Sequence, residues 1–143
     1  MFSHIVLGTN DRQRSNAFYE AIMPTMGWRR RHSATNPELT IWQPPETARP
    51  FFILASPFDR NAAAPGNGAT TAFMVPERAM VDEVFARALM AGATSEGDPG
   101  PRPHYHAHYY GCYFRDLDGH KLCVVCHEPA TVAAPSVHRE GQN

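Results

Sequence analysis

Residues 4–27, HIVLGTNDRQRSNAFYEAIMPTMG, and residues 70–92, TTAFMVPERAMVDEVFARALMAG, decide the fold. Each stretch is typical of a strand followed by a helix that stops at a glycine. The Asn-Asp pair at 10–11 is suited to cap the first helix, and Pro76 is suited to the first turn of the second. The apolar side chains after each start recur at helical spacing. The sequence therefore contains two strand–helix units.

The two units follow one another at a constant spacing along the chain. His4 and Thr70 are 66 positions apart, and Phe18 and Val84 are also 66 positions apart. Because strand and helix keep the same spacing in both units, the pattern favours an internal duplication.

Strand-forming segments follow each predicted helix. They are rich in β-branched and aromatic residues, and turns containing proline, glycine or aspartate separate them. The Asp-Leu-Asp-Gly sequence at 116–119 predicts a hairpin between the last two segments. The predicted strands lie at 28–33, 39–43 and 51–55 in the first half and at 109–115 and 121–127 in the second.

The segment between the two halves is rich in Ala, Asn, Gly and Pro, which predicts a linker. The last residues have little apolar content, and we expect a mobile tail there. A chain of 143 residues has the usual length of one domain. We therefore predict a single domain over 1–130, with module one at about 1–57, a linker at 58–68 and module two at 69–130, followed by the tail at 131–143.

Each predicted helix has one apolar stripe, which must pack on one face of a sheet. The other face of the sheet is then free to curve around a cavity. Concave apolar surfaces with a few polar groups bind small molecules. The sequence therefore predicts an α+β fold in which a curved mixed sheet surrounds a small-molecule pocket and the helices lie outside.

Composition and charge argue against several classes of partner. The formal net charge is −1, from 13 Lys and Arg against 14 Asp and Glu, which gives no broad attraction for nucleic acid or an anionic membrane. No apolar segment approaches the roughly 18 residues of a membrane helix, and no signal peptide is visible at the N-terminus. Three cysteines, an odd number, fit a reducing compartment. We expect a cytoplasmic protein.

The segment RPHYHAHYYG at 102–111 has the most unusual composition in the chain. Arg102 is able to hold a carboxylate through two hydrogen bonds. Tyr105, His106 and Tyr110 are able to hydrogen-bond to a ligand or stack on it. Two other interpretations stay open, because alternating histidines also bind metals and because a loop of this kind can simply pack over the rim of the sheet.

Five other residues have both a structural and a functional interpretation. Trp42 and Phe52, on two first-half strands, would either line an apolar wall of the pocket or fill the core. His4, in the first strand, would be either hydrogen-bonded or metal-bound. Cys123 and Cys126 form a CxxC sequence, but strand alternation turns them to opposite faces, so the pair predicts neither chelation nor a disulfide. Cys123 alone could face the pocket.

Three stretches of the chain resemble the glyoxalase/bleomycin-resistance/extradiol-dioxygenase superfamily, which has the vicinal oxygen chelate fold. The resemblance implies two paired β-α-β-β-β modules. It also implies a homodimer, because many members are dimeric. The stretches are HIVLGTNDRQRSNAFYEAIMPTMGW from residue 4, PGNGATTAFMVPERAMVDEVFARALMAGA from residue 65 and RPHYHAHYYGCYFRDLDGHKLCVVCHEP from residue 102.

Metal-dependent members of this superfamily bind a divalent ion through the first and last strands of each module. By motif position, His4 matches the first-strand ligand, Thr70 stands where the second module usually supplies a histidine, and Cys123 stands at the last-strand glutamate. The matching first-half strand, 51–54, contains no carboxylate. The resemblance therefore implies a degenerate metal site, with zinc, iron, manganese or nickel as the candidate ions.

Three functional hypotheses follow. The first is a bleomycin-resistance-like protein that binds a small polar or anionic organic molecule in the pocket without a standard metal centre. The second is a divalent-metal-dependent lyase, isomerase or dioxygenase of the same superfamily with altered ligands. The third, a jelly-roll metal oxygenase inferred from His104 and His106, conflicts with the two predicted helices and lacks a suitably spaced glutamate.

Overall fold

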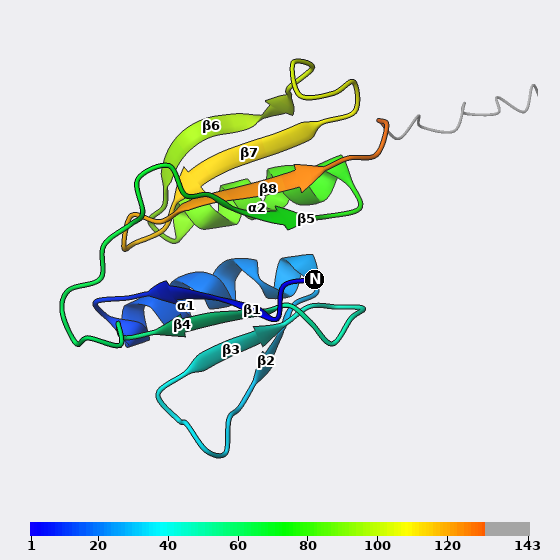
Figure 1. Cartoon of the computed structure of the whole chain (residues 1–143). Coiled ribbons are helices and arrows are strands. Elements are labelled where there is room, and N and C mark those ends of the chain that lie inside the picture. Colours follow the sequence, from blue (N-terminus) through cyan, green and yellow to red (C-terminus); the bar gives the residue numbers. More distant parts are fainter. Residues whose placement is uncertain (131–143) are drawn as a thin grey trace, which may run out of the picture.

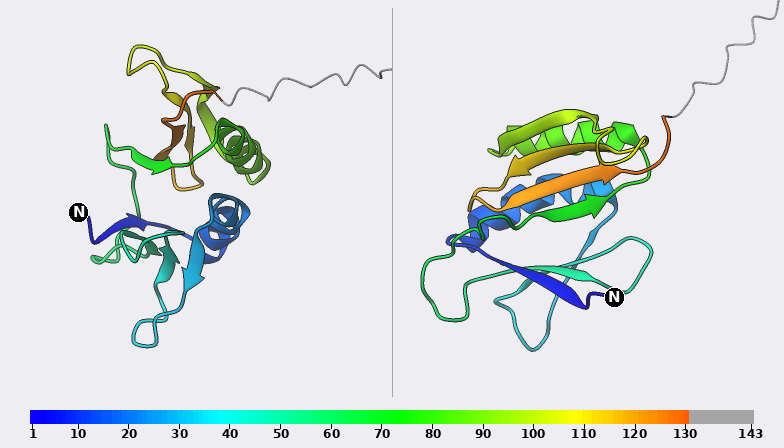
Figure 2. Two further views of the ribbon diagram at one scale, coloured as in Figure 1. Left: turned by 90° about the vertical axis from the view of Figure 1, so that its right-hand side faces the viewer. Right: turned by 45° about the horizontal axis from the view of Figure 1, so that its top comes forward.

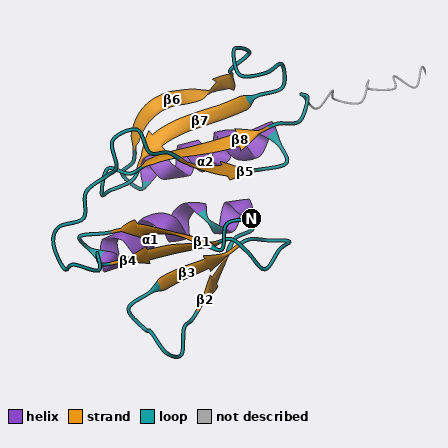
Figure 3. Ribbon diagram, in the orientation of Figure 1, coloured by secondary structure: helices purple, strands orange, loops and turns teal. Residues whose placement is uncertain are grey.

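The computed structural model describes residues 1–130, and the predicted tail at 131–143 lies outside the described residues. Two modules with the same order of elements follow one another along the chain (Figures 1 and 3). Module one contains β1 (His4–Gly8), α1 (Arg12–Ile22), a 3-10 turn (Pro24–Met26), β2 (Arg29–Arg31), β3 (Thr40–Gln43) and β4 (Phe51–Ala55). Module two contains β5 (Thr71–Met74), α2 (Arg78–Met90), β6 (Thr94–Pro101), β7 (Tyr110–Arg115) and β8 (Lys121–Cys126).

The strands form two four-stranded sheets with the same topology. Sheet one has the order β1-β4-β3-β2, and sheet two has the order β5-β8-β7-β6. In each sheet the first strand pairs in parallel with the last strand of its module, and the remaining pairs are antiparallel. The α+β fold of two β-α-β-β-β modules is therefore confirmed, with the strands divided between two mixed sheets.

The first helix starts as the sequence predicts, but α1 ends at Ile22 and a 3-10 turn continues to the predicted stop at Gly27. Asp11 caps α1, because its side chain accepts a hydrogen bond of 3.0 Å from the backbone N–H of Arg14. Pro24 opens the 3-10 turn that follows α1, and Gly27 ends that turn with a positive φ of 81°. A proline cannot continue the hydrogen bonds of an α-helix, so the chain tightens here and turns into β2.

The two modules share one hydrophobic core. Both helices lie side by side on the same side of the molecule (Figure 2). Between them and the sheets, the ring of Tyr19 lies 5.1 Å from that of Phe52, which in turn lies 5.3 Å from that of Phe73. Phe18 and Phe114 continue the cluster at 6.5 Å. Because these aromatic contacts cross from one module to the other, neither half has a separate core.

The β7–β8 hairpin also ties the modules together through polar contacts. His120 donates from Nε2 to the carbonyl oxygen of Gly8 at 2.7 Å. Asp118 accepts a hydrogen bond of 2.9 Å from the backbone N–H of Asn10. The Asp-Leu-Asp-Gly-His sequence thus holds the start of α1 against module two, in addition to making the predicted turn.

The strand β6 was not among the strands predicted from the sequence. Its sequence, TSEGDPGP, contains two glycines and two prolines, which are depleted in strands. It is nevertheless an edge strand that pairs with β7 only, with shifts of register on either side of Gly97. Proline is tolerated at such an edge, because one side of the strand needs no sheet partner.

No helix in residues 1–130 is long and apolar enough to span a bilayer.

Candidate functional site

Each sheet has one face against the helices and one face turned away from them, which we call the open face. Trp42 and Phe52 belong to the shared core and therefore mark the helix-facing side of sheet one. Ile41, Phe51 and Ile53 form a separate small cluster on its open face. Adjacent positions of a strand point to opposite faces, so the two clusters alternate along β3 and β4.

The open face of sheet two carries a cluster of two phenols and a thiol, Tyr109, Tyr113 and Cys123, which we call the tyrosine–thiol cluster. The hydroxyl oxygens of Tyr109 and Tyr113 lie 2.7 Å apart. The Tyr109 hydroxyl also lies 3.5 Å from the sulfur of Cys123. Cys123 is only 1% exposed, because the two rings cover it. The three groups form one hydrogen-bonded unit.

A glycine leaves the space that this cluster needs. Gly111, on β7, lies two positions after Tyr109 and two positions before Tyr113. A methyl group at this position would stand 3.0 Å from the ring of Tyr109 and 3.2 Å from the carbonyl oxygen of Val124. Because no side chain is present, the Tyr109 ring can fold back along β7 until its hydroxyl reaches Tyr113.

Burial raises the pKa of all three groups of the cluster, so they keep their protons well above neutral pH. It raises the pKa of the Tyr109 phenol far above its usual range, and hydrogen bonds to Cys123 and Tyr113 add to the shift. Burial is also the largest cause of the raised pKa of Tyr113. The pKa of the Cys123 thiol is raised by burial, although hydrogen bonds from the two tyrosines oppose the shift. The cluster therefore offers neutral O–H and S–H donors.

Two cations flank the ring of Tyr113. The Lys121 ammonium lies 5.2 Å from the ring centroid, and the Arg102 guanidinium lies 5.9 Å from it. The Arg102 guanidinium donates hydrogen bonds of 2.9 Å and 2.8 Å to the carbonyl oxygens of Gly100 and Asp98. Arg102 therefore places positive charge at the open face, while part of its donor capacity is used by its own strand.

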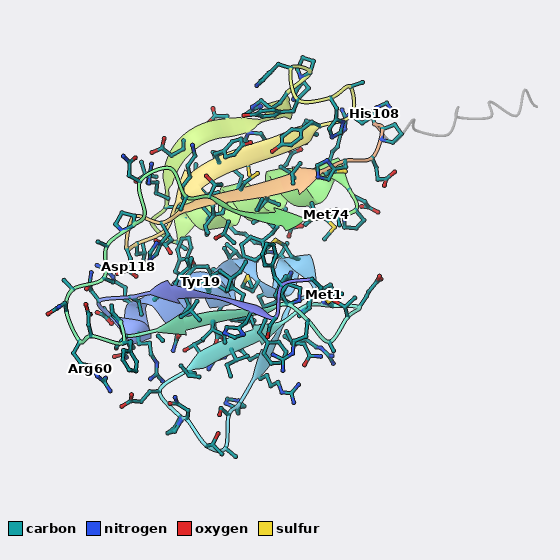
Figure 4. The ribbon with its side chains drawn as sticks, viewed as in Figure 1. Met1, Tyr19, Arg60, Met74, His108 and Asp118 are labelled. Carbon is teal, nitrogen blue, oxygen red and sulfur yellow. The ribbon has the colours of Figure 1, made fainter. Side chains whose placement is uncertain are left out.

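A pair of histidines closes the end of this face. His106 and His127 contact each other through Nε2 and Nδ1 at 2.8 Å. The backbone N–H of His108 donates to Nδ1 of His106 at 3.1 Å, so His106 carries its proton on Nε2 and donates it to His127. Figure 4 shows His108 on the loop beside the end of β8. The ring of Tyr109 packs edge-on against both imidazoles.

Three of the predicted ligand-binding residues lie together on the open face of sheet two. Arg102 and His106 flank the tyrosine–thiol cluster, and the exposed ring of Tyr105 lies 4.8 Å from that of Tyr109. Tyr109, which touches all of these groups, was not singled out from the sequence.

The other three predicted ligand-binding residues point toward the helices. Trp42 and Phe52 are each 1% exposed and fill the core. The hydroxyl of Tyr110 donates to Asp82 of α2 at 2.6 Å, and the Arg78 guanidinium lies over its ring. Tyr110 is thus packed on the opposite side of β7 from Tyr109. These three side chains are separated from the open faces by the sheets.

The three positions that the resemblance assigns to metal ligands do not form a metal site within one chain. His4 is exposed on β1, where its Nδ1 lies 3.0 Å from the hydroxyl of Ser3. Thr70 is exposed before β5, whereas Cys123 is covered by the tyrosines. Across residues 1–130, no group of three or more His, Cys, Asp or Glu side chains is arranged to hold a metal ion. The described residues of one chain therefore show no metal centre at these three positions.

Comparisons with known proteins identify the family. The model of the Glyoxalase/Bleomycin resistance protein/Dioxygenase superfamily matches residues 1–124, so the chain belongs to this superfamily, as its sequence predicts. No curated protein matches the chain.

Solved structures with the same fold extend this result. A glyoxalase/bleomycin resistance protein from Albidiferax ferrireducens is 32% identical, with a TM-score of 0.76 over 88% of this chain and 98% of its own. A glyoxalase-related enzyme from Fulvimarina pelagi is 22% identical, with a TM-score of 0.67 over 94% of this chain and 99% of its own. The fosfomycin resistance protein FosX from Mesorhizobium loti is 17% identical, with a TM-score of 0.62 over 92% and 93% of the two chains. The last two similarities show the fold alone.

Proposed function

We propose that the protein binds a small polar or anionic organic molecule on the open face of sheet two, and that the tyrosine–thiol cluster supplies the central contacts. The observation that carries this proposal is the hydrogen-bonded set of neutral donors at Tyr109, Tyr113 and Cys123. Phenols that stay protonated in a partly buried site are effective donors to a carboxylate, enolate or other oxyanion.

The charges around the cluster support the same class of ligand. Lys121 and Arg102 lie on either side of Tyr113, and no ion pair engages either of them within residues 1–130. A ligand oxygen that replaces the Tyr109–Tyr113 contact would meet two O–H donors and two nearby cations. Cys123 stands where the resemblance places a metal-binding glutamate, and here hydrogen-bond donors occupy the space around that position.

The test is a thermal-shift screen of the purified protein against a panel of metabolites and antibiotics, followed by calorimetric titration of the best ligand. Tyr113→Phe removes one donor and should weaken binding about tenfold or more, since a hydrogen bond to a charged group contributes about 1.5–3 kcal/mol. Tyr110→Phe is the matched control, because it removes a phenol hydroxyl from the other side of β7. A panel without any saturable ligand, or an equal loss in both variants, would contradict the proposal.

A metal-dependent lyase, isomerase or dioxygenase is the second candidate, and the exposed position of His4 on the open face of sheet one favours it. Metal analysis of protein purified without chelator tests this candidate. Near-stoichiometric zinc, iron, manganese or nickel that is lost in His4→Ala would support it, and metal-free protein that takes up none of these ions would count against it. A homodimer and a cytoplasmic location complete the proposal, and light scattering and cell fractionation test them.

A further inference from the structure

A groove separates the two sheets where their edge strands face each other. Among the described residues, β1 pairs only with β4 and β5 pairs only with β8, so both strands have an unpaired edge at this place. The groove has a volume of about 320 Å³. Its lining is mostly apolar and includes Trp28, Pro44, Pro50, Phe51, Phe73 and Met74. Figure 4 shows Met74 at the gap between the modules.

Two guanidinium groups lie over one aromatic ring of this groove. The guanidinium carbon of Arg49 lies 3.9 Å from the centroid of Phe51, and that of Arg31 lies 5.3 Å from the same centroid. Phe51 is the register partner of His4, so this pair of cations stands beside the first strand on the open face of sheet one. A guanidinium group that stacks on an aromatic ring still has N–H donors available for a ligand.

These two cations have no carboxylate partner in the described part of the chain. The ion pairs there use Arg30, Arg60, Arg87 and Arg115 instead. The only side-chain hydrogen bond of Arg31 in residues 1–130 is a long one of 3.4 Å to Gln43, which is uncharged. In a protein with a formal net charge of −1, this is a local concentration of positive charge without an ion pair, and it lies over Phe51, one of the residues that line the apolar groove.

We infer that the groove binds a small amphipathic carboxylate, with its apolar body between β1 and β5 and its carboxylate on Arg31 and Arg49. Arginine recognises carboxylates through paired N–H donors, and two guanidinium groups lie over one ring that lines this groove. The groove also borders the proposed site, because Ala72 lines it and is the register partner of Cys123. The inference rests on the proposed small-molecule binding, and it adds the ligand class and a second set of contacts.

The test compares octanoate with 1-octanol, which share an eight-carbon chain and differ in charge. Calorimetric titration of the full chain should show octanoate binding at least tenfold more tightly than 1-octanol. The Arg31→Ala/Arg49→Ala variant should lose this preference. The Arg60→Ala/Arg87→Ala variant removes the same charge elsewhere on the surface and should keep it. Equal binding of both compounds to the wild-type protein, or an equal loss in the control variant, would overturn the inference.

A second variant and a salt series keep the test informative if removing the arginine stems disturbs Phe51. Arg31→Gln/Arg49→Gln keeps much of each stem and should also lose the preference for octanoate. Raising the salt concentration should weaken octanoate binding without weakening 1-octanol binding, since only the former depends on charge. A salt-independent preference for octanoate would contradict the inference.

The experiments distinguish a failure of the proposed binding at the tyrosine–thiol cluster from a failure of the inferred carboxylate site in the groove. A ligand from the screen whose binding depends on Tyr113 and not on Arg31 or Arg49 would leave the proposed function intact. It would overturn the inference that the groove and its two arginines bind the ligand. Octanoate binding that depends on the arginines and is unchanged in Tyr113→Phe would support the groove and count against the tyrosine–thiol cluster as the central contact.

Discussion

The hydroxyl of Tyr19 on α1 donates a hydrogen bond of 2.5 Å to Asp116 at the β7–β8 turn, 97 positions later in the chain. Tyr19 is fully buried and Asp116 is 7% exposed. The other carboxylate oxygen of Asp116 accepts from the backbone N–H groups of Asp118 and His120. One carboxylate thus shapes the hairpin with one oxygen and holds module one with the other. Figure 4 shows Tyr19 between the two modules.

Tyr19→Phe should lower the free energy of unfolding by about 2 kcal/mol, because it leaves a buried carboxylate oxygen without its donor. Urea denaturation followed by circular dichroism measures this change. Tyr105→Phe, at an exposed tyrosine, should change stability by less than about 0.5 kcal/mol. A loss in Tyr19→Phe no larger than in this control would show that the contact contributes little.

The thiol of Cys123 should react slowly with iodoacetamide at pH 8, since burial raises its pKa and the thiolate is the reactive form. Tyr109→Ala removes the ring that covers it and should raise the alkylation rate of Cys123 about tenfold or more. Cys112 and Cys126, which lie on the other side of the sheet, serve as internal controls. Peptide mapping by mass spectrometry measures all three rates. A similar increase at all three cysteines would indicate general loosening of the fold instead.

Stability should fall at alkaline pH. Burial raises the pKa of the Cys112 thiol from 9.0 to about 12, so the folded protein holds this proton more tightly than the unfolded chain. The contribution of Cys112 is therefore complete below pH 9 and is lost as the pH rises toward 12. From Cys112 alone, the free energy of unfolding should be about 1 kcal/mol lower at pH 10 than at pH 8.

Urea denaturation across this pH range measures the dependence, and Cys112→Ala should flatten it whatever the stability of that variant at pH 8. Tyr19 contributes in the same direction, because burial and the charge of Asp116 raise its pKa well above the ordinary value. A profile of Cys112→Ala parallel to that of the wild-type protein would contradict the assignment.

The contact between His106 and His127 should protect the segment 102–109 from hydrogen exchange. The two rings contact each other at 2.8 Å, and the backbone N–H of His108 donates to His106. His127→Ala should make exchange of this segment about fivefold faster, the factor expected for about 1 kcal/mol. His104→Gln should leave the exchange rate unchanged. Equal rates in His127→Ala and the wild-type protein would contradict the prediction.

The sequence was sufficient for the elements whose signals are local. Asp11 and Gly27 mark the limits of the first helical region because capping and a positive φ depend on single residues. The strand β6 depends on its neighbour instead, since a Gly- and Pro-rich segment becomes an edge strand only when β7 is present to pair with it. No local pattern predicts that pairing.

The predicted residues that the structure brings together in the candidate site, Arg102, Tyr105 and His106, were singled out by the composition of their segment and not by strand alternation. Trp42 and Phe52 lie in strands that are apolar on both faces, so alternation alone does not tell which face meets the helices. Tyr109 and Tyr110 point to opposite faces of sheet two because they are neighbours in the chain. The sequence does not show where the loop ends and β7 begins, so it does not tell which of the two tyrosines lies on the open face. Gly111 and Cys123, which share the open face, are the signals that would have favoured Tyr109 and Tyr113.

The shared core has a consequence for half-length chains. Cleavage in the segment 58–68, which lies between β4 and β5 and contains no helix or strand, would leave two fragments that each expose the aromatic surface now buried between the modules. Each fragment would recover that burial by associating with the other. The protein is therefore suited to fragment complementation, with reassembly reported by the return of a cooperative unfolding transition.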